Sequence, residues 1–259
     1  MDYNYLNFSI DNQVAWLRFA RREKLNALNP DFIVELGHAV EICSKNNDIR
    51  VVVLTGNPKA FIAGADIKNM AEAGVDDAYK LSELTNFVQN KISRLAKPSI
   101  AAISGYALGA GCEVALCCDF RIGAENAILG LPEINLGIIP GGGGTQRLPR
   151  LIGIGPAMRL ILTGELVKAE EAEKIGLLDK VVPLEGFEAS VSSFAAQLAK
   201  KPPIAVRAAK QAILCGIDSS LDNGLILEQN LFAMLFGTKD QRIGMRAFLE
   251  KQTPEFSGQ

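Results

Sequence analysis

Histidine is almost absent from this sequence of 259 residues, in which His38 is the only one. It lies in a segment with an amphipathic pattern, where a histidine is typical of a helix surface or of packing. The scarcity argues against a Ser-His-Asp triad, a histidine-rich metal site and an HExxH zinc motif. We therefore predict no metal site.

Cysteine is scarce too, and its arrangement excludes a disulfide framework. The five cysteines are an odd number and none forms a CxxC pair, and four of them lie in apolar surroundings: Cys43, Cys112, Cys117, Cys118 and Cys215. Reduced and mostly buried thiols are the expectation. The opening "MDYNYLNFSI" has neither a basic and then apolar leader nor an Arg/Ser-rich arm, which predicts a cytoplasmic protein.

Excess charge and long uninterrupted apolar runs are also missing. The formal net charge is -2 and the pI is about 5.6, which excludes the basic footprint of a nucleic-acid binder. An anionic ligand must then meet local lysines or backbone amides. The stretch from Pro98 to Cys118 has Glu113 as its only charge, but glycines interrupt it, so we predict a buried strand, a loop and a buried helix and no membrane span.

The residues that are present alternate between strand and helix patterns. We expect a β-hairpin turning at Asp11-Asn12, a helix with Asn29 as its N-cap, and buried strands at "RVVVLTG" and "KPSIAAISG" with an amphipathic helix, residues 76–95, between them. From about Ile154 the pattern is helical, with "KVV" near Lys180 as the one clear strand. Such alternation predicts a layered α/β domain. We divide the chain into a core, residues 1–195, and a C-terminal helical region, residues 196–259.

Two glycine-rich stretches resemble nucleotide-binding loops but do not complete the motifs. "PGGGGTQ" lacks the lysine of a phosphate-binding loop, and "GAGCEV" has Val114 where a dinucleotide fingerprint needs a third small residue. Glycines in these stretches still let a ligand approach the backbone closely.

Two carboxylates stand among small and apolar neighbours. Glu113 follows Gly111, and Glu133 follows Pro132 in "GLPEINLG". A buried carboxylate without a partner is costly or takes up a proton, so each glutamate either caps a helix or has a chemical task. The loop "FIAGADI" leaves similar alternatives open, since its backbone N–H groups could form an oxyanion hole or Asp66 could simply cap the turn.

Four motifs, taken in order and spacing, resemble the enoyl-CoA hydratase (crotonase) family over nearly the whole chain. They are "KLNAL", "AFIAGADIK", "SGYALGAGCEVALCCDFRI" and "LGLPEINLGIIPGGGGTQRL". The resemblance implies an α/β fold, a crotonase-like superhelix of ββα units, followed by C-terminal helices that build a homotrimer or a homohexamer of two trimers.

The resemblance also implies roles for site residues. Glu113 and Glu133 match the family's two catalytic glutamates, and the backbone N–H groups of Ala65 and Ala110 match the two oxyanion donors, although a glycine is common at position 110. The positions expected to contact the substrate are Lys24, Ala27, Ala63, Asp66, Ile67, Lys68, Leu108, Gly109, Pro132 and Gly141, with Phe248 and Lys251 reaching a neighbouring subunit's nucleotide. No separate cofactor is implied, because coenzyme A is part of the substrate.

The activity that follows is reversible hydration of short-chain trans-2-enoyl-CoA. Two alternatives remain open at this stage. An enoyl-CoA isomerase needs only one base, so the presence of two glutamates argues against it. A non-catalytic RNA-binding member of the family would need a basic stripe, which the net charge of -2 does not favour. Acyl-chain length, physiological direction and pathway are not readable from the sequence.

Overall fold

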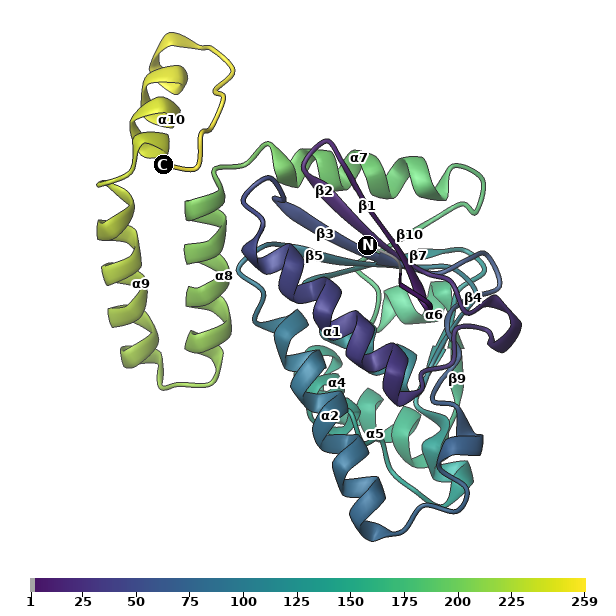
Figure 1. Ribbon diagram of the computed structural model, residues 1–259. Helices are drawn as coiled ribbons and strands as arrows, with labels where there is room; N and C mark the ends of the chain where they lie inside the picture. The colour runs from purple at the N-terminus through teal and green to yellow at the C-terminus, as the bar shows by residue number, and fades with distance from the viewer. Residues whose placement is uncertain (1–2) are drawn as a thin grey trace.

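The computed structural model describes residues 3–259, and two sheets form its centre (Figure 1). The larger sheet has the order β1-β2-β3-β5-β7-β10, and only the β1–β2 pair is antiparallel. Its strands are β1 (Leu6–Asp11), β2 (Val14–Phe19), β3 (Val51–Thr55), β5 (Ser99–Ile103), β7 (Phe120–Ala124) and β10 (Lys180–Val182). The smaller sheet has the order β4-β6-β8-β9 and consists of β4 (Ala60–Ile62), β6 (Tyr106–Leu108), β8 (Ile128–Gly130) and β9 (Leu166–Lys168).

The predicted strands of the larger sheet are confirmed. Every residue of β3 and β5 is buried, as expected of strands that are covered on both faces. The hairpin is confirmed as well, but its turn lies one residue later than predicted. Asp11 still pairs with Val14, and the positive φ angles are those of Asn12 and Gln13.

The smaller sheet was not predicted. Its strand β4 lies in the segment assigned to a loop, and β9 contradicts the expectation that "KVV" is the one strand after Ile154. Strands of three residues are too short for an alternating pattern to be visible. Close backbone contacts, which depend on glycine, hold this layer: a Cβ at Gly105 would lie 2.1 Å from the Lys59 carbonyl oxygen, and one at Gly111 would lie 2.1 Å from that of Ile62.

Helices cover both faces of the larger sheet, with α1 on one side and α7 on the other (Figure 1). The helices of this part are α1 (Pro30–Lys45), α2 (Val75–Ser93), α3 (Ala110–Leu116), α4 (Gly144–Ile152), α5 (Ile154–Thr163), α6 (Ala169–Lys174) and α7 (Phe187–Ala199), with 3-10 turns η1 (Arg22–Lys24), η2 (Ile67–Asn69) and η3 (Pro132–Leu136). The predicted cap of α1 is confirmed, since Asn29 Oδ1 accepts a hydrogen bond from the Phe32 N–H at 2.8 Å.

The last three helices extend away from the sheets (Figure 1): α8 (Pro203–Ile217), α9 (Leu221–Leu235) and α10 (Lys239–Glu250). Lys210 fastens α8 to the core through an ion pair with Asp119 at 2.7 Å. None of the residues of α9 is buried. Helix α7 continues across residue 195, and the division of the chain into 1–195 and 196–259 stays a prediction.

The thiols are free and mostly buried, as expected, whereas the apolar stretch contains a short strand, β6, where a loop was predicted. All five cysteines are free, and all but Cys215 are buried. Burial raises the pKa of the Cys43, Cys112 and Cys117 thiols to about 12. The stretch from Pro98 to Cys118 forms β5, β6 and α3, and among residues 3–259 no helix has the length and apolar character needed to cross a membrane.

Candidate active site

Glu113 lies in the first turn of α3, and only 3% of it is exposed. Its Oε1 atom accepts two backbone hydrogen bonds, from the N–H of Gly142 at 2.7 Å and from that of Gly144 at 2.9 Å. Burial raises the pKa of the Glu113 carboxyl, while these two hydrogen bonds and the charge of Arg147 oppose the rise. The Glu113 carboxylate is therefore partnered by backbone amides.

The loop that supplies these amides, residues 141–144, depends on glycine. Gly143 has φ of 103°, which disfavours a side chain, and a Cβ at Gly142 would lie 2.6 Å from Glu113 Oε2. Helix α2 fixes the loop from outside, because Ser82 Oγ and Asn86 Nδ2 both donate to the Gly141 carbonyl, at 2.7 and 2.8 Å. A rigid loop of this kind keeps the Glu113 carboxylate in one orientation.

Ser82, Asn86 and Asn90 form a polar row on α2, a functional feature that the sequence reasoning missed. Asn90 continues the row and accepts a hydrogen bond from Arg147 Nη2 at 2.8 Å, while Arg147 Nη1 donates to the Gly142 carbonyl at 3.0 Å. Ser82, Asn86 and Asn90 are spaced by four residues, which places them on one face of a helix. That spacing is visible in the sequence and could have shown that α2 supports a polar site.

Glu133 lies in the first turn of η3, immediately after Pro132. Its Oε2 atom is buried and has no hydrogen-bond partner among the described residues. Burial, with a smaller effect from the Glu113 charge, raises the pKa of the Glu133 carboxyl to about 7. A Cβ at Gly109 would lie 3.0 Å from Glu133 Oε1, so the φ of 51° at Gly109 and its lack of a side chain make room for this carboxyl.

The two predicted oxyanion donors belong to neighbouring loops. Ala65 forms a parallel bridge with Leu28, in which the Leu28 N–H donates to the Gly64 carbonyl and the Leu28 carbonyl accepts from the Asp66 N–H. In such a bridge the N–H of the middle residue points away from the partner strand. Ala110 is the first residue of α3, where an N–H has no partner within the helix.

These loops adjoin each other and Glu133. A Cβ at Gly64 would lie 3.7 Å from the Leu108 carbonyl oxygen, and one at Gly109 would lie 3.8 Å from the Gly64 Cα. The structure therefore brings the segments around Ala65, Ala110 and Glu133 together. All three come from the smaller sheet or the turns that follow its strands.

A second group of predicted residues is held together by Arg21, which the sequence reasoning did not select. Its guanidinium donates to the Ala27 carbonyl at 2.8 Å and to Asp66 Oδ2 at 2.8 Å, and the latter contact lowers the pKa of the Asp66 carboxyl. Arg21 thus joins the loop of Ala27 to the loop of Asp66. Among the other predicted contacts in these loops, Lys24, Ile67 and Lys68 are exposed and Ala63 is partly buried. The positive charges of the exposed Lys24 and Lys68 are suited to phosphate groups.

The C-terminal residues are not brought to this site. Helix α10, which carries Phe248, lies at the opposite end of the molecule from β4 (Figure 1). Phe248 is 84% exposed, and Lys251 is the C-cap of α10 with φ of 56°. Within one chain, Phe248 and Lys251 therefore lie on a surface that is separate from Glu113 and Glu133.

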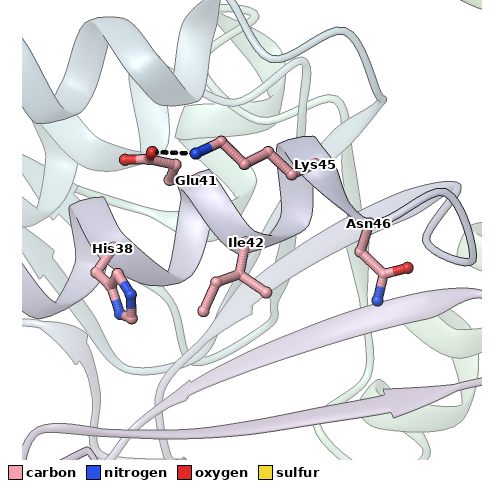
Figure 2. A pocket seen from close by; sticks show the side chains of 5 residues that line it. All are labelled: His38, Glu41, Ile42, Lys45 and Asn46. Carbon is pink, nitrogen blue, oxygen red and sulfur yellow. Dashed lines mark hydrogen bonds and ion pairs between the residues drawn. The ribbon is translucent and has the colours of Figure 1, made fainter.

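A shallow hollow over α1 is lined by His38, Glu41, Ile42, Lys45 and Asn46 (Figure 2), and it contains no predicted site residue. The Glu41–Lys45 ion pair at 2.7 Å is an ordinary contact along a helix, and His38 hydrogen-bonds to the Tyr3 hydroxyl at 3.0 Å. Among residues 3–259 no group of three or more potential ligand side chains could hold a metal ion.

Comparison with known proteins decides the family. The family model for enoyl-CoA hydratase/isomerase matches residues 9–259. The chain belongs to the enoyl-CoA hydratase/isomerase family. It is 41% identical to the crotonyl-CoA hydratase of Syntrophomonas wolfei, with 99% of each chain covered, and 41% identical to the short-chain-enoyl-CoA hydratase of Clostridium acetobutylicum, with 98% of each covered.

A solved structure agrees with the sequence relatives. Enoyl-CoA hydratase from Bacillus anthracis superimposes with a TM-score of 0.96 at 41% identity, covering 99% of this chain and 100% of that one. The fold class and the family implied by the four motifs are confirmed. The roles of individual residues within this enoyl-CoA hydratase/isomerase family member stay predictions.

Proposed function

We propose that this protein catalyses the reversible hydration of short-chain trans-2-enoyl-CoA to 3-hydroxyacyl-CoA. The observation that carries the proposal is the buried Glu113 and the partly buried Glu133 beside the N–H groups of Ala65 and Ala110, which have no backbone partner among residues 3–259. The similarity to hydratases whose names specify crotonyl-CoA and short-chain enoyl-CoA supports the same substrate class.

Hydration needs two acid–base groups, one for the water and one for the carbon that gains a proton. In the proposed mechanism Glu113 orients the water and accepts its proton as the oxygen bonds to C3. Glu133, whose pKa is raised to about 7, gives a proton to C2. Exchange with solvent then resets both carboxyls, and the reverse sequence dehydrates the 3-hydroxyacyl thioester.

Negative charge develops on the thioester oxygen as the water adds to C3. We assign the N–H groups of Ala65 and Ala110 to this oxygen, because preorganised donors stabilise such a charge in a site that excludes water. Both donors belong to the backbone, so the side chains at these positions need only be small. An alanine at position 110 fits this requirement because it is an ordinary first residue of a helix.

The proposed ligand is a coenzyme A thioester, with Lys24 and Lys68 near the nucleotide and Ala27, Ala63, Asp66, Ile67, Leu108, Gly109, Pro132 and Gly141 along the rest of the ligand. We also propose a homotrimer, or a hexamer of two trimers, in which Phe248 and Lys251 contact the nucleotide of a neighbouring subunit. The exposed apolar side chains of α9, which include Leu221 at 76% and Phe232 at 63%, support burial by another subunit. Light scattering tests this: a mass near 27.8 kDa for fully active protein would contradict it.

No further cofactor, nucleic acid or membrane enters the proposal, and the cytoplasmic location stays a prediction. Isomerisation is the competing activity, and the family model's own description includes it. An isomerase moves one proton between C2 and C4 and needs one base, whereas this site holds two carboxyl groups.

The test is a spectroscopic assay with the whole protein. Hydration of crotonyl-CoA removes the conjugated double bond, so ultraviolet absorbance should fall, whereas isomerisation of a 3-enoyl-CoA creates conjugation and absorbance should rise. We expect the fall with crotonyl-CoA to be the dominant activity. A protein that isomerises 3-enoyl-CoA and leaves crotonyl-CoA unchanged would be an isomerase.

A further inference from the structure

Gln89 is a buried polar residue of α2 that the proposed mechanism does not use. Only 2% of it is exposed, and its Nε2 atom has no hydrogen-bond partner among the residues that the structure describes. Buried amide donors in folded proteins nearly always have a partner, because leaving one unpaired is costly. An unpaired donor at this depth therefore marks a place where a polar atom is expected.

The nearest candidate for that atom is the free oxygen of Glu113. A Cβ built at Gly142 would lie 2.6 Å from Glu113 Oε2 and 2.8 Å from Gln89 Nε2, so both atoms flank one point beside the glycine loop. The other oxygen of the carboxylate, Oε1, already accepts the N–H groups of Gly142 and Gly144. Oε2 is thus the oxygen left for chemistry, and the Gln89 amide nitrogen lies near the same point beside Gly142.

The orientation of the Gln89 amide is supported by the contact that its oxygen atom, Oε1, makes. Cys117 Sγ lies 3.6 Å from Gln89 Oε1 and 3.1 Å from the Glu113 carbonyl oxygen. Burial raises the pKa of the Cys117 thiol to about 12, so it stays protonated and acts as a donor. A flipped amide would turn its carbonyl oxygen toward the Glu113 carboxylate, and two acceptors would then face each other.

We propose that Gln89 is a positioning residue for Glu113: the Gln89 amide donates through one bridging water molecule to Glu113 Oε2, and so keeps this carboxyl ionised and correctly rotated. The inference rests on the proposed function. It assigns to α2 a part in the reaction, in addition to the anchoring of the glycine loop by Ser82, Asn86 and Asn90.

The charged and titratable groups around Glu113 come from three elements. Helix α3 contributes the protonated thiols of Cys112 and Cys117, η3 contributes Glu133, and α4 contributes the Arg147 guanidinium. Helix α2 contributes Thr85 and Gln89, which carry no charge. Glu133 disfavours the ionised form of Glu113, and Arg147 favours it, so removal of a neutral donor shifts this balance toward the protonated acid.

The experiment replaces Gln89 by leucine, which keeps a side chain of similar bulk and removes the amide. We expect Gln89→Leu to lower kcat for crotonyl-CoA by about tenfold, with KM within about twofold of the wild type. The acidic limb of the profile of kcat/KM against pH should move up by about half a pH unit or more, because Glu113 would hold its proton to a higher pH. The control is Thr85→Val, which removes a neighbouring hydroxyl and keeps the shape; its acidic limb should not move.

A double variant separates a role through Glu113 from a structural one. In a Glu113→Gln background the same Gln89→Leu change should cost less than about twofold, because a residue that acts through Glu113 has no further effect once that carboxyl is gone. An unmoved acidic limb in Gln89→Leu, or a full loss repeated in the Glu113→Gln background, overturns the inference.

Three further outcomes are also informative. If Gln89→Leu does not fold, Gln89→Glu keeps the shape, replaces the donor and should shift the acidic limb in the same direction, and an unmoved limb there overturns the inference equally. If the wild type does not hydrate crotonyl-CoA, the proposed function and this inference fall together. If the wild type is active and the variants keep its pH profile, the inference alone falls.

Discussion

The surroundings of the two glutamates differ in how each carboxyl group is satisfied. Around Glu113, the glycine loop presents two N–H groups at 2.7 and 2.9 Å, and Arg147 adds a positive charge. Around Glu133, the backbone of Gly109 leaves space but no such pair of donors, and Oε2 has no partner among residues 3–259. Both carboxyls come from the first turn of a short helix. The difference lies in the neighbouring backbone, which provides two donors to Glu113 and, at Gly109, space for Glu133.

The comparison teaches how one fold assigns two roles to one residue type. Donors that point at a carboxylate favour its ionised form, and burial without donors favours the protonated form. Burial raises the pKa of both carboxyls, but two backbone donors and Arg147 oppose the rise at Glu113, so we expect Glu113 to act as the base and Glu133, with its pKa raised to about 7, as the proton donor. Substitutions that remove one side of this contrast at a time test the assignment.

The largest effect is expected when either carboxyl becomes an amide. Glu113→Gln and Glu133→Gln should each lower the turnover of crotonyl-CoA by about 10²-fold to 10⁴-fold, because each removes an acid–base group. Binding of coenzyme A, measured by calorimetry, should change little. Near-wild-type hydration by either variant would remove that glutamate from the mechanism.

The next largest effect is expected from loss of the Ala110 N–H group, the proposed oxyanion donor. Ala110→Pro removes the backbone N–H at the first position of α3, where a helix tolerates proline, and should cost about 10²-fold to 10³-fold in kcat. Ala110→Gly keeps the N–H and should be mild. A folded Ala110→Pro protein with normal hydration would show that the oxyanion donor lies elsewhere.

A smaller effect should follow from crowding the surroundings of Glu113 and leaving those of Glu133 unchanged. In Gly142→Ala the new Cβ would lie 2.6 Å from Glu113 Oε2, so the carboxylate must move, and we expect kcat to fall by about 10-fold to 10²-fold. Gly155→Ala in α5 is the control, because a Cβ there would meet nothing within 4 Å. Equal activities of the two variants in the ultraviolet assay would contradict the assigned geometry.

The smallest effect is one of stability and depends on pH. The pKa of Glu133 is raised in the folded protein, so the folded state retains a proton that the unfolded state loses as pH rises from about 4.5 to about 7. Glu133→Gln removes this penalty and should stabilise the protein at pH 8 by about 1–2 kcal/mol after allowance for solvent screening, with a smaller gain at pH 5. Thermal unfolding at both pH values measures it. The exposed Glu72→Gln should show no such difference, and a gain that does not grow with pH would argue against a raised pKa.

Much of the fold and both glutamates could be predicted from the sequence, because local patterns in the chain indicate them. The buried strands β3 and β5, the cap of α1 at Asn29 and the two isolated glutamates are all visible as local patterns. The smaller sheet was missed because strands such as β4 span three residues and are held by close backbone contacts at Gly105 and Gly111, which leave no periodic trace.

The support around the site was harder to predict than the glutamates themselves. The roles of Arg21 and of the polar row on α2 depend on partners far along the chain, such as Asp66 and Gly141, and a sequence shows no distance between them. The same holds for Gln89, whose amide lies beside Gly142 only because α2 packs against the glycine loop. Spacing by four residues on α2 was the one local sign.

The measurement that tests the central claim most directly is the mass of the product formed in water labelled with heavy oxygen. Crotonyl-CoA is incubated with the wild type and with the Glu113→Gln/Glu133→Gln double variant, and the thioesters are separated and weighed by mass spectrometry. The account predicts 3-hydroxybutyryl-CoA, heavier than the substrate by one labelled water molecule, from the wild type and essentially none from the double variant. A product of unchanged mass, or equal hydration by both proteins, would contradict it.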